Sequence, residues 1–184
     1  MPQKTKRDWL EAGLHILGEL GANGLTIDEL TRRLGVTKGS FYHHFEHYQE
    51  YKEHLLAFFE EEGTLQIIQL MEQESTPARK LARLLEVTTR AAPDREVALR
   101  AWALLDTQVR GYQERIDQRR LAYLADLFSA LTQDAAQGVL LARLFYALYV
   151  GSQHIVPPLQ GEALKQLYQE LQRLPGLFPL EQAQ

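Results

Sequence analysis

The sequence predicts an all-α protein of about nine helices. Apolar residues recur at steps of three and four along most of the 184 residues, which is the period of an amphipathic helix. No stretch sustains the period-two alternation of a strand, and no Asn-Gly pair lies between β-branched runs as a hairpin would require. Prolines, glycines and hydroxyl residues divide the periodic stretches into separate helices.

The first helix is predicted from about Lys6 to Leu20. A single apolar stripe runs along it, and Gly21 and Gly24 follow as stop signals. The stripe consists of Trp9, Leu10, Leu14, Leu17 and Leu20.

The second helix begins at Thr26 and is short. Thr26 and Glu29 have the spacing of a capping box, in which the hydroxyl and the carboxylate each satisfy a backbone amide of the other residue. Leu30 and Leu34 form its inward side, and Gly35 provides the turn that ends it.

The third helix is predicted to begin at Thr37, which we expect to cap it. Phe41 and Phe45 lie four residues apart and should share its buried side. The remaining side chains should point more or less outward: Lys38, Gly39, Ser40, Tyr42, His43 and His44.

The rest of the chain predicts further helices separated by clear breaks. A long fourth helix should run from about residue 47 to 72, and Thr76 with Pro77 begins the next. Pro93 breaks the chain before another helix, whose apolar residues include Val97, Leu99, Trp102 and Leu105, and a longer one follows to about Leu131. Thr132 is the expected cap of a strongly apolar helix to about Val156, and a last helix begins at Gly161 and ends at Pro175-Gly176.

Composition places the chain among ordinary globular proteins. It is 45% hydrophobic and 24% charged, which argues against disorder. The absence of cysteine excludes disulfides and thiolate metal sites. The basic start at residues 4–7 leads into an amphipathic pattern rather than a signal sequence, and the most apolar stretch, 139–150, is too short to span a bilayer. We therefore expect a cytoplasmic protein.

The charge pattern leaves room for nucleic-acid binding. The net charge is −4, which argues against a general nucleic-acid binder. Residues 1–50 nevertheless concentrate their Lys and Arg at 4–7 and 32–38, and no acid occurs from Leu30 to Phe45. Phosphate binding needs a local basic surface rather than a basic protein.

Residues 26–45 therefore have the properties of a DNA-reading helix-turn-helix. A recognition helix must fit the major groove, which is about 12 Å wide, and Gly39 and Ser40 would permit close approach. Thr26 and Thr37 would place helix N-termini against phosphates. Lys38 could reach a phosphate or a guanine edge.

The same residues resemble the DNA-binding domain of the TetR/AcrR family of bacterial transcriptional regulators. The resemblance covers residues 9–47 and rests on two runs: Gly-x-x-Gly-Leu-Thr-Ile-Asp-Glu-Leu at 21–30, and Leu-Gly-Val-Thr-Lys-Gly-Ser-Phe-Tyr-His-His-Phe at 34–45. It implies a three-helix DNA-binding domain over residues 1–46. It also implies a helical regulatory and dimerisation domain over 47–184.

One position departs from the family pattern. The family usually has lysine at the start of the long helix and leucine three residues later, where this chain has Tyr48 and Tyr51. The lysine commonly touches a phosphate, so an electrostatic contact is expected to be missing, although Tyr48 could still donate a hydrogen bond. The residues that we assign to DNA are Thr26, Thr37, Lys38, Gly39, Ser40, Tyr42, His43, His44 and Tyr48.

The regulatory half offers a ligand site and a dimer interface. Trp102, Gln108, Tyr112 and Tyr146 are candidates for lining a small-molecule pocket, although aromatic residues at helical spacing equally suit a plain core. The apolar helices at 133–156 and 161–174 could pack within one chain. The resemblance instead implies that they pair with the same helices of a second chain in a four-helix bundle.

The sequence thus predicts a homodimeric regulator, acting as a repressor that a small molecule releases from a palindromic operator. Control by a protein partner without a small-molecule effector is an alternative, and a helical enzyme is a remote one. No nucleophile elbow, phosphate loop or Glu-x-x-His pair is present, so we predict no catalytic residue and no cofactor. His43 and His47 have metal-ligand spacing, but a helix end at Phe45 should separate them, so we predict no metal site.

Overall fold

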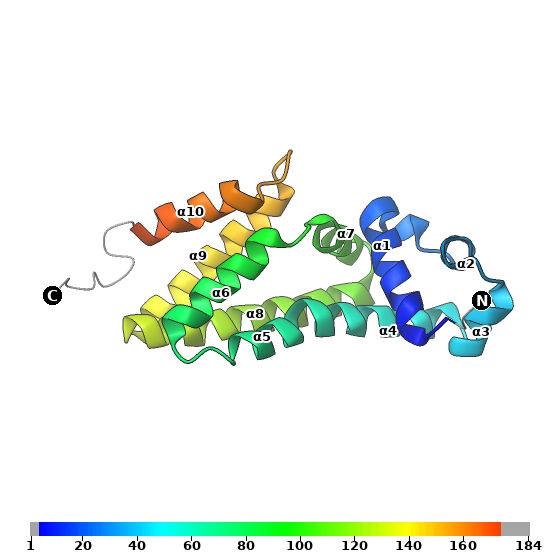
Figure 1. Ribbon diagram of the computed structural model, residues 1–184, viewed down its shortest axis with the longest axis horizontal. Coiled ribbons are helices and arrows are strands. Elements are labelled where there is room, and N and C mark those ends of the chain that lie inside the picture. Colours follow the sequence, from blue (N-terminus) through cyan, green and yellow to red (C-terminus); the bar gives the residue numbers. More distant parts are fainter. Residues whose placement is uncertain (1–3, 174–184) are drawn as a thin grey trace. The chain divides into compact units, whose positions relative to one another are not determined.

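The computed structural model describes residues 4–173, and every regular element in that range is a helix (Figure 1). The predicted all-α class is therefore correct. The elements are α1 (Lys6–Gly24), α2 (Ile27–Leu34), α3 (Lys38–His44), α4 (Tyr48–Glu60), the π-helix η1 (Glu61–Leu65), α5 (Gln66–Met71), α6 (Pro77–Arg90), α7 (Asp94–Ala103), α8 (Thr107–Thr132), α9 (Ala135–His154) and α10 (Gly161–Arg173). None of the helices in residues 4–173 is long and apolar enough to cross a bilayer.

The chain packs as two compact units. The first unit consists of residues 1–63 and 94–116, and the second of residues 64–93 and 117–184. The long run predicted for residues 47–72 is continuous from Tyr48 to Met71, with the π-helical turn η1 inside it. The predicted division into a DNA-binding part, 1–46, and a regulatory part, 47–184, concerns function and stays a prediction.

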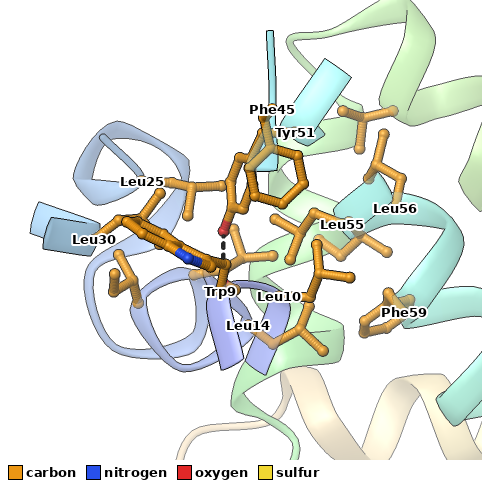
Figure 2. Close-up of a cluster of buried hydrophobic side chains, with 14 of the residues drawn as sticks. Trp9, Leu10, Leu14, Leu25, Leu30, Phe45, Tyr51, Leu55, Leu56 and Phe59 are labelled. Atoms are coloured by element: carbon orange, nitrogen blue, oxygen red, sulfur yellow. Dashed lines mark hydrogen bonds between the residues drawn. The ribbon is translucent and has the colours of Figure 1, made fainter. Parts of the chain in front are cut away.

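Aromatic side chains form the centre of the first unit. Trp9, Phe41 and Tyr51 are fully buried, and the rings of Trp9 and Phe41 meet edge to face with centroids 5.5 Å apart. Phe45 is 1% exposed, so the prediction that Phe41 and Phe45 face inward is confirmed. Figure 2 shows leucines of α1 and α4 packed around these rings. This core fixes α3 against α1 and α4.

The predicted stripe on α1 is correct except at its end. Leu20 is 51% exposed, whereas Ile16, which the stripe omitted, is fully buried. The chain leaves helical backbone at Gly21, where φ is +68°, and the Leu20 side chain lies over Gly24 instead of the core. The helix begins with a capping box between Thr5 and Asp8 that the sequence analysis did not identify.

The caps of α2 and α3 differ in part from the prediction. The Thr26 hydroxyl accepts a 3.2 Å hydrogen bond from the amide of Glu29, as expected. The reciprocal half of the capping box is absent because the Glu29 carboxylate binds Arg32 and Arg33. Thr37 occupies the capping position of α3, but its side chain makes no capping hydrogen bond. Thr37 is therefore the N-cap residue of α3 as predicted, but its hydroxyl does not satisfy a backbone amide of the helix.

Gly35 forms the turn between α2 and α3 as predicted. It lies in the left-handed region at φ +66°, ψ +37°, where a side chain is unfavourable. Its amide donates to the carbonyl of Thr31, which closes the last turn of α2.

The second unit contains α5, α6, α9, α10 and the later part of α8. Its core includes Phe128, Leu141 and Phe145, and the ring of Tyr168 on α10 stacks on Phe145 at 5.6 Å. A Cβ on Gly138 would lie 2.6 Å from the backbone nitrogen of Ser129, so this glycine allows α8 and α9 to approach closely.

Three boundary predictions for these later helices need correction. Leu105 is 89% exposed because it lies in the turn between α7 and α8 rather than on a helix. Asp134 caps α9, accepting from the amides of residues 136 and 137, whereas Thr132 is the last residue of α8. The helix ends at His154, two residues before the predicted Val156. The predicted stop at 175–176 lies outside the described residues.

Candidate nucleic-acid interface

Helix α3 has a buried side and an exposed side. Phe41 and Phe45 anchor it in the core, whereas Lys38, Gly39, Tyr42 and His43 are exposed. No side chain outside its own turn lies near the Cβ position of Gly39, which is 3.6 Å from the Thr37 hydroxyl. The backbone at the start of the exposed side is therefore open, and the base edges in a DNA groove could approach it closely.

His44 and Ser40 are less exposed than the sequence suggested. Both are half-buried, and the His44 ring lies 6.3 Å from that of Trp9. The Nε2 atom of His44 is buried without a hydrogen-bond partner. His44 therefore contributes to packing between α3 and α1 as well as to the edge of the candidate surface.

A surface hollow of about 430 Å³ brings four of the predicted DNA-contacting residues together. It lies where the end of α1, the start of α2 and the start of α3 meet, and Thr26, Lys38, Tyr42 and Tyr48 all line it. Thr37, Gly39, Ser40, His43 and His44 do not line it. Hydroxyl donors and an ammonium group around the N-terminus of a helix are groups that phosphate oxygens bind.

The basic side chains of this region are paired with carboxylates. Lys38 Nζ lies 2.6 Å from an oxygen of Asp28, an exposed residue in the first turn of α2. Arg32 binds Glu29 at 2.6 Å, and Arg33 bridges Glu29 and Glu19. The two arginines hold the pKa of Glu29 at about 2, with the Arg32 hydrogen bond the larger cause.

Tyr48 is held inside the fold by its hydroxyl group. The hydroxyl donates a 2.7 Å hydrogen bond to the backbone carbonyl of Leu25, the residue before Thr26. Burial raises the pKa of Tyr48 to about 12, with a further contribution from the Asp106 charge. Tyr48 thus ties the start of α4 to the segment that leads into α2, a positioning role that the sequence analysis missed.

Comparisons with known proteins agree with this geometry. The family model described as bacterial regulatory proteins, tetR family, matches residues 10–50, which contain α2 and α3. The crystal structure of a TetR/AcrR family member is similar to this chain with a TM-score of 0.76 at 25% identity, covering 90% of this chain and 97% of that one. No curated protein matches the chain in sequence.

Residues 10–50 therefore match the tetR family of bacterial regulatory proteins, and the chain has the fold of TetR/AcrR transcriptional regulators.

Two other solved structures share the fold of this chain. Reduced NemR from E. coli has a TM-score of 0.77 at 17% identity, with 96% of this chain and 98% of that one covered. A transcriptional regulator from Saccharomonospora viridis in complex with choline has a TM-score of 0.72 at 15% identity, with 91% and 93% covered. The family match thus covers the helix-turn-helix of this chain, and the shared fold is that of transcriptional regulators.

The predicted ligand-binding residues are divided between the two units. Trp102, Gln108 and Tyr112 belong to the first unit and Tyr146 to the second. Trp102 lies under the ammonium of Lys52 at 5.3 Å, and the Gln108 amide bonds Gln49 and Glu53. Trp102 and Gln108 therefore have contacts within the first unit, and their role toward a ligand stays a prediction.

The other two aromatic candidates also have internal contacts. Tyr112 stacks under the guanidinium of Arg115 at 4.2 Å. The hydroxyl of Tyr146 donates a 2.7 Å hydrogen bond to Asp117. Neither side chain lines the cleft between α6 and α10.

That cleft lies in the second unit and has a volume of about 730 Å³. Its apolar side includes Leu81, Leu85 and Tyr168, and its polar rim includes Arg90 and Lys165, with other residues of α6, α8 and α10. None of the four predicted ligand residues lines it. In the sequence, the feature that could have indicated this cleft is the amphipathic pattern of α6 and α10. The same pattern is equally compatible with ordinary helix packing.

Within residues 4–173, no group of three His, Cys, Asp or Glu side chains is placed so that it could hold a metal ion. The predicted helix end separates the two histidines, because α3 ends at His44 and His47 precedes α4. The Nδ1 atom of His47 accepts a 3.0 Å hydrogen bond from the amide of Glu50, so His47 caps α4.

Proposed function

We propose that this regulator is a homodimeric repressor that reads a palindromic operator with α3. The observation that carries the proposal is the division of α3 into a buried side, Phe41 and Phe45, and an exposed side that begins with Lys38 and Gly39. A helix held rigidly on one side and open on the other can enter the major groove. Two such helices in a dimer would read half-sites about one helical turn, roughly 34 Å, apart. Acting on bacterial DNA, the protein would work in the cytoplasm.

The proposed dimer interface is supported by apolar side chains left on the surface of the second unit. Leu140 and Leu144 on α9 are 63% and 39% exposed, and Leu167 on α10 is 38% exposed. Leu141 and Phe145 on the same helix, α9, are buried in the unit's own core. Each helix thus has one apolar side used internally and a second that a partner helix could cover, as in a four-helix bundle formed by residues 133–156 and 161–174 of two chains.

We further propose that a small molecule controls this regulator. The cleft of about 730 Å³ in the second unit falls within the size range of ligand sites, and the S. viridis relative is in complex with choline. An effector would act by binding the conformation that does not fit the operator more tightly, by about 1–3 kcal/mol. Control by a protein partner alone would suit a second unit with no such cleft.

The proposal predicts that the protein protects a palindromic sequence. Random-site selection, together with a gel shift on DNA upstream of its own gene, should yield a sequence-selective and salt-sensitive complex. Lys38→Met should weaken that complex by about tenfold, the effect of losing one charged contact worth ~1.4 kcal/mol. Lys80→Met removes the same charge from α6, outside the proposed interface helices and the cleft lining, and serves as the control. Failure of the wild type to select any sequence would refute the proposed function.

The dimer is tested separately at α9. Leu140→Glu places a charge on the proposed interface and should convert the protein to a monomer in analytical ultracentrifugation. Gln118→Glu, at an exposed position of α8, adds the same charge away from it. A Leu140→Glu protein that remained as dimeric as the control would show that α9 does not form the interface.

A further inference from the structure

The carboxylate of Asp28 binds the ammonium of Lys38, the group that the proposed function assigns to a DNA phosphate. Asp28 Oδ1 is 2.6 Å from Lys38 Nζ, and both side chains line the hollow that also contains Thr26 and Tyr42. The side chains of Lys38 and Asp28 are 60% and 74% exposed, so solvent or a ligand reaches both. The hydrogen bond to Asp28 raises the pKa of Lys38 above its ordinary value.

Asp28 also occupies the start of α2. It is the second residue of that helix, next to the N-terminal backbone amides that attract anions. Thr26, whose hydroxyl caps the helix, also lines the hollow. Both features of the hollow that would attract a phosphate, the ammonium of Lys38 and the helix N-terminus, therefore face an internal carboxylate in the free protein.

We propose that Asp28 limits the affinity of this regulator for DNA by competing with phosphate for the ammonium of Lys38. The inference rests on the proposed DNA contact of α3. A phosphate and the Asp28 carboxylate are attracted to the same ammonium charge, so a phosphate bound to Lys38 either displaces Asp28 or lies close to its negative charge. Phosphate contacts carry no sequence information, so Asp28 lowers the affinity for operator and for random DNA by the same factor.

A purely structural role of the ion pair makes a different prediction. If the pair only fastened α3 to α2, its removal would loosen the helix-turn-helix and weaken DNA binding. Exposed ion pairs contribute little to stability, and here both partners are largely exposed. The competing role therefore predicts tighter binding on removal of Asp28, and the structural role predicts weaker binding.

The test measures binding to a random-sequence duplex of about 30 base pairs by fluorescence anisotropy over a series of salt concentrations, so it needs no operator. Asp28→Asn should bind about two- to fivefold more tightly than the wild type, the range expected when an exposed ion pair no longer has to be broken. The slope of log affinity against log salt should steepen by up to about one ion. Asp28→Glu retains the charge and should behave like the wild type.

Two controls separate the competition from general electrostatics. Asp94→Asn removes a carboxylate from the first turn of α7 in the same unit, and it should leave affinity unchanged. In a Lys38→Met background, Asp28→Asn should have no effect, because the competed donor is gone. Thermal unfolding of each variant confirms that it is folded, and Asp28→Ser replaces Asp28→Asn if the latter is not.

The outcomes distinguish this inference from the proposed function. If the wild type binds no DNA, the proposed function fails and the inference fails with it. If the wild type binds but Asp28→Asn matches Asp94→Asn, or binds more weakly than the wild type, the competition is refuted while DNA binding stands. A gain that persists in the Lys38→Met background would likewise refute the route through Lys38.

Discussion

Gly13 of α1 and the hydroxyl of Tyr51 in α4 occupy one space. A Cβ atom on Gly13 would lie 1.8 Å from the Tyr51 oxygen, far inside any permitted contact. The missing side chain lets the buried hydroxyl reach the backbone carbonyl of Trp9, to which it donates a 3.1 Å hydrogen bond (Figure 2). Tyr51 stands where the resemblance to the TetR/AcrR family leads us to expect leucine, and Gly13 is the residue that accommodates the larger ring.

This relationship predicts that Gly13→Ala destabilises the protein although alanine favours helices. The added methyl group would collide with Tyr51, and such overpacking costs about 1–3 kcal/mol. Helix propensity offsets this cost by roughly 1 kcal/mol, so we expect a net decrease in the free energy of unfolding. Urea denaturation followed by circular dichroism would measure the change.

The double variant supplies the control for that prediction. Tyr51→Leu removes the colliding hydroxyl, so Gly13→Ala made in a Tyr51→Leu background should be neutral or stabilising. The two substitutions should therefore couple strongly, as residues in contact do. Equal effects of Gly13→Ala in both backgrounds would show that Tyr51 is not the obstacle.

Removing the Tyr48 hydroxyl should weaken the attachment of α4 to the segment before α2. Tyr48→Phe keeps the ring but leaves the Leu25 carbonyl without this donor, which should lower the free energy of unfolding by about 1 kcal/mol. Tyr42→Phe removes an exposed tyrosine hydroxyl from the same hollow and should not change stability. If both variants unfold at the same denaturant concentration as the wild type, the hydrogen bond contributes nothing.

Tyr48→Lys should restore the phosphate contact that the family pattern implies at this position. We expect tighter operator binding and a salt dependence steeper by about one ion, because lysine adds one counterion-releasing contact. The same substitution removes the hydrogen bond to Leu25, so stability should fall as it does in Tyr48→Phe. Unchanged affinity and an unchanged salt slope would show that residue 48 does not face the DNA backbone.

The sequence was most informative where one short-range pattern has one physical solution. The four-residue spacing of Phe41 and Phe45 correctly predicted the buried side of α3, and Gly35 correctly predicted the left-handed turn. It was least informative where a side chain has two partners to choose from. Glu29 could bond the amide of Thr26 or the guanidinium groups of Arg32 and Arg33, and only the folded geometry shows that it binds the arginines.

Contacts between residues far apart in the chain were also beyond the sequence. The family pattern suggested that Tyr48 could donate a hydrogen bond to a DNA phosphate, yet its hydroxyl donates to the carbonyl of Leu25, which lies 23 residues earlier. Likewise the apolar stripe of α9 gave no means to separate Leu141, which is buried in its own unit, from Leu140, which is exposed. A helical period identifies an apolar side but does not identify what covers it.

The ion pair between Lys52 and Asp106 should make a large contribution to the stability of the first unit. Lys52 Nζ lies 2.5 Å from Asp106, and the lysine side chain is only 9% exposed. Asp106→Asn retains the amide acceptor that caps the start of α8 but removes the charge, leaving Lys52 buried and unpaired. Loss of a fully buried partner costs about 3–5 kcal/mol, and the 28% exposure of Asp106 reduces our expectation to roughly 2 kcal/mol.

Lys52→Met provides the comparison for Asp106→Asn. This substitution removes the buried ammonium and leaves only the more exposed carboxylate of Asp106 without its partner. The apolar methionine side chain can still pack on Trp102. The variant should therefore be less destabilised than Asp106→Asn in the same denaturation experiment. The reverse order would show that the carboxylate, rather than the ammonium, is the group that cannot be left unpaired.

Stability should fall in acid partly because Glu29 becomes protonated. Hydrogen bonds from Arg32 and then Arg33 hold the pKa of Glu29 at about 2, against 4.5 for an ordinary glutamate. A pKa that is lower in the folded state means that the carboxylate contributes stability above pH 4.5 and loses it as the pH falls towards 2. The Glu29→Gln variant lacks this group, so the stability difference between wild type and variant should shrink across that window. Denaturant midpoints measured at neutral pH and at several acid pH values would show it, with Glu170→Gln on α10 as the matched change at another exposed pair. A difference that stays constant down to pH 2 would mean that the arginines do not stabilise the ionised form of Glu29.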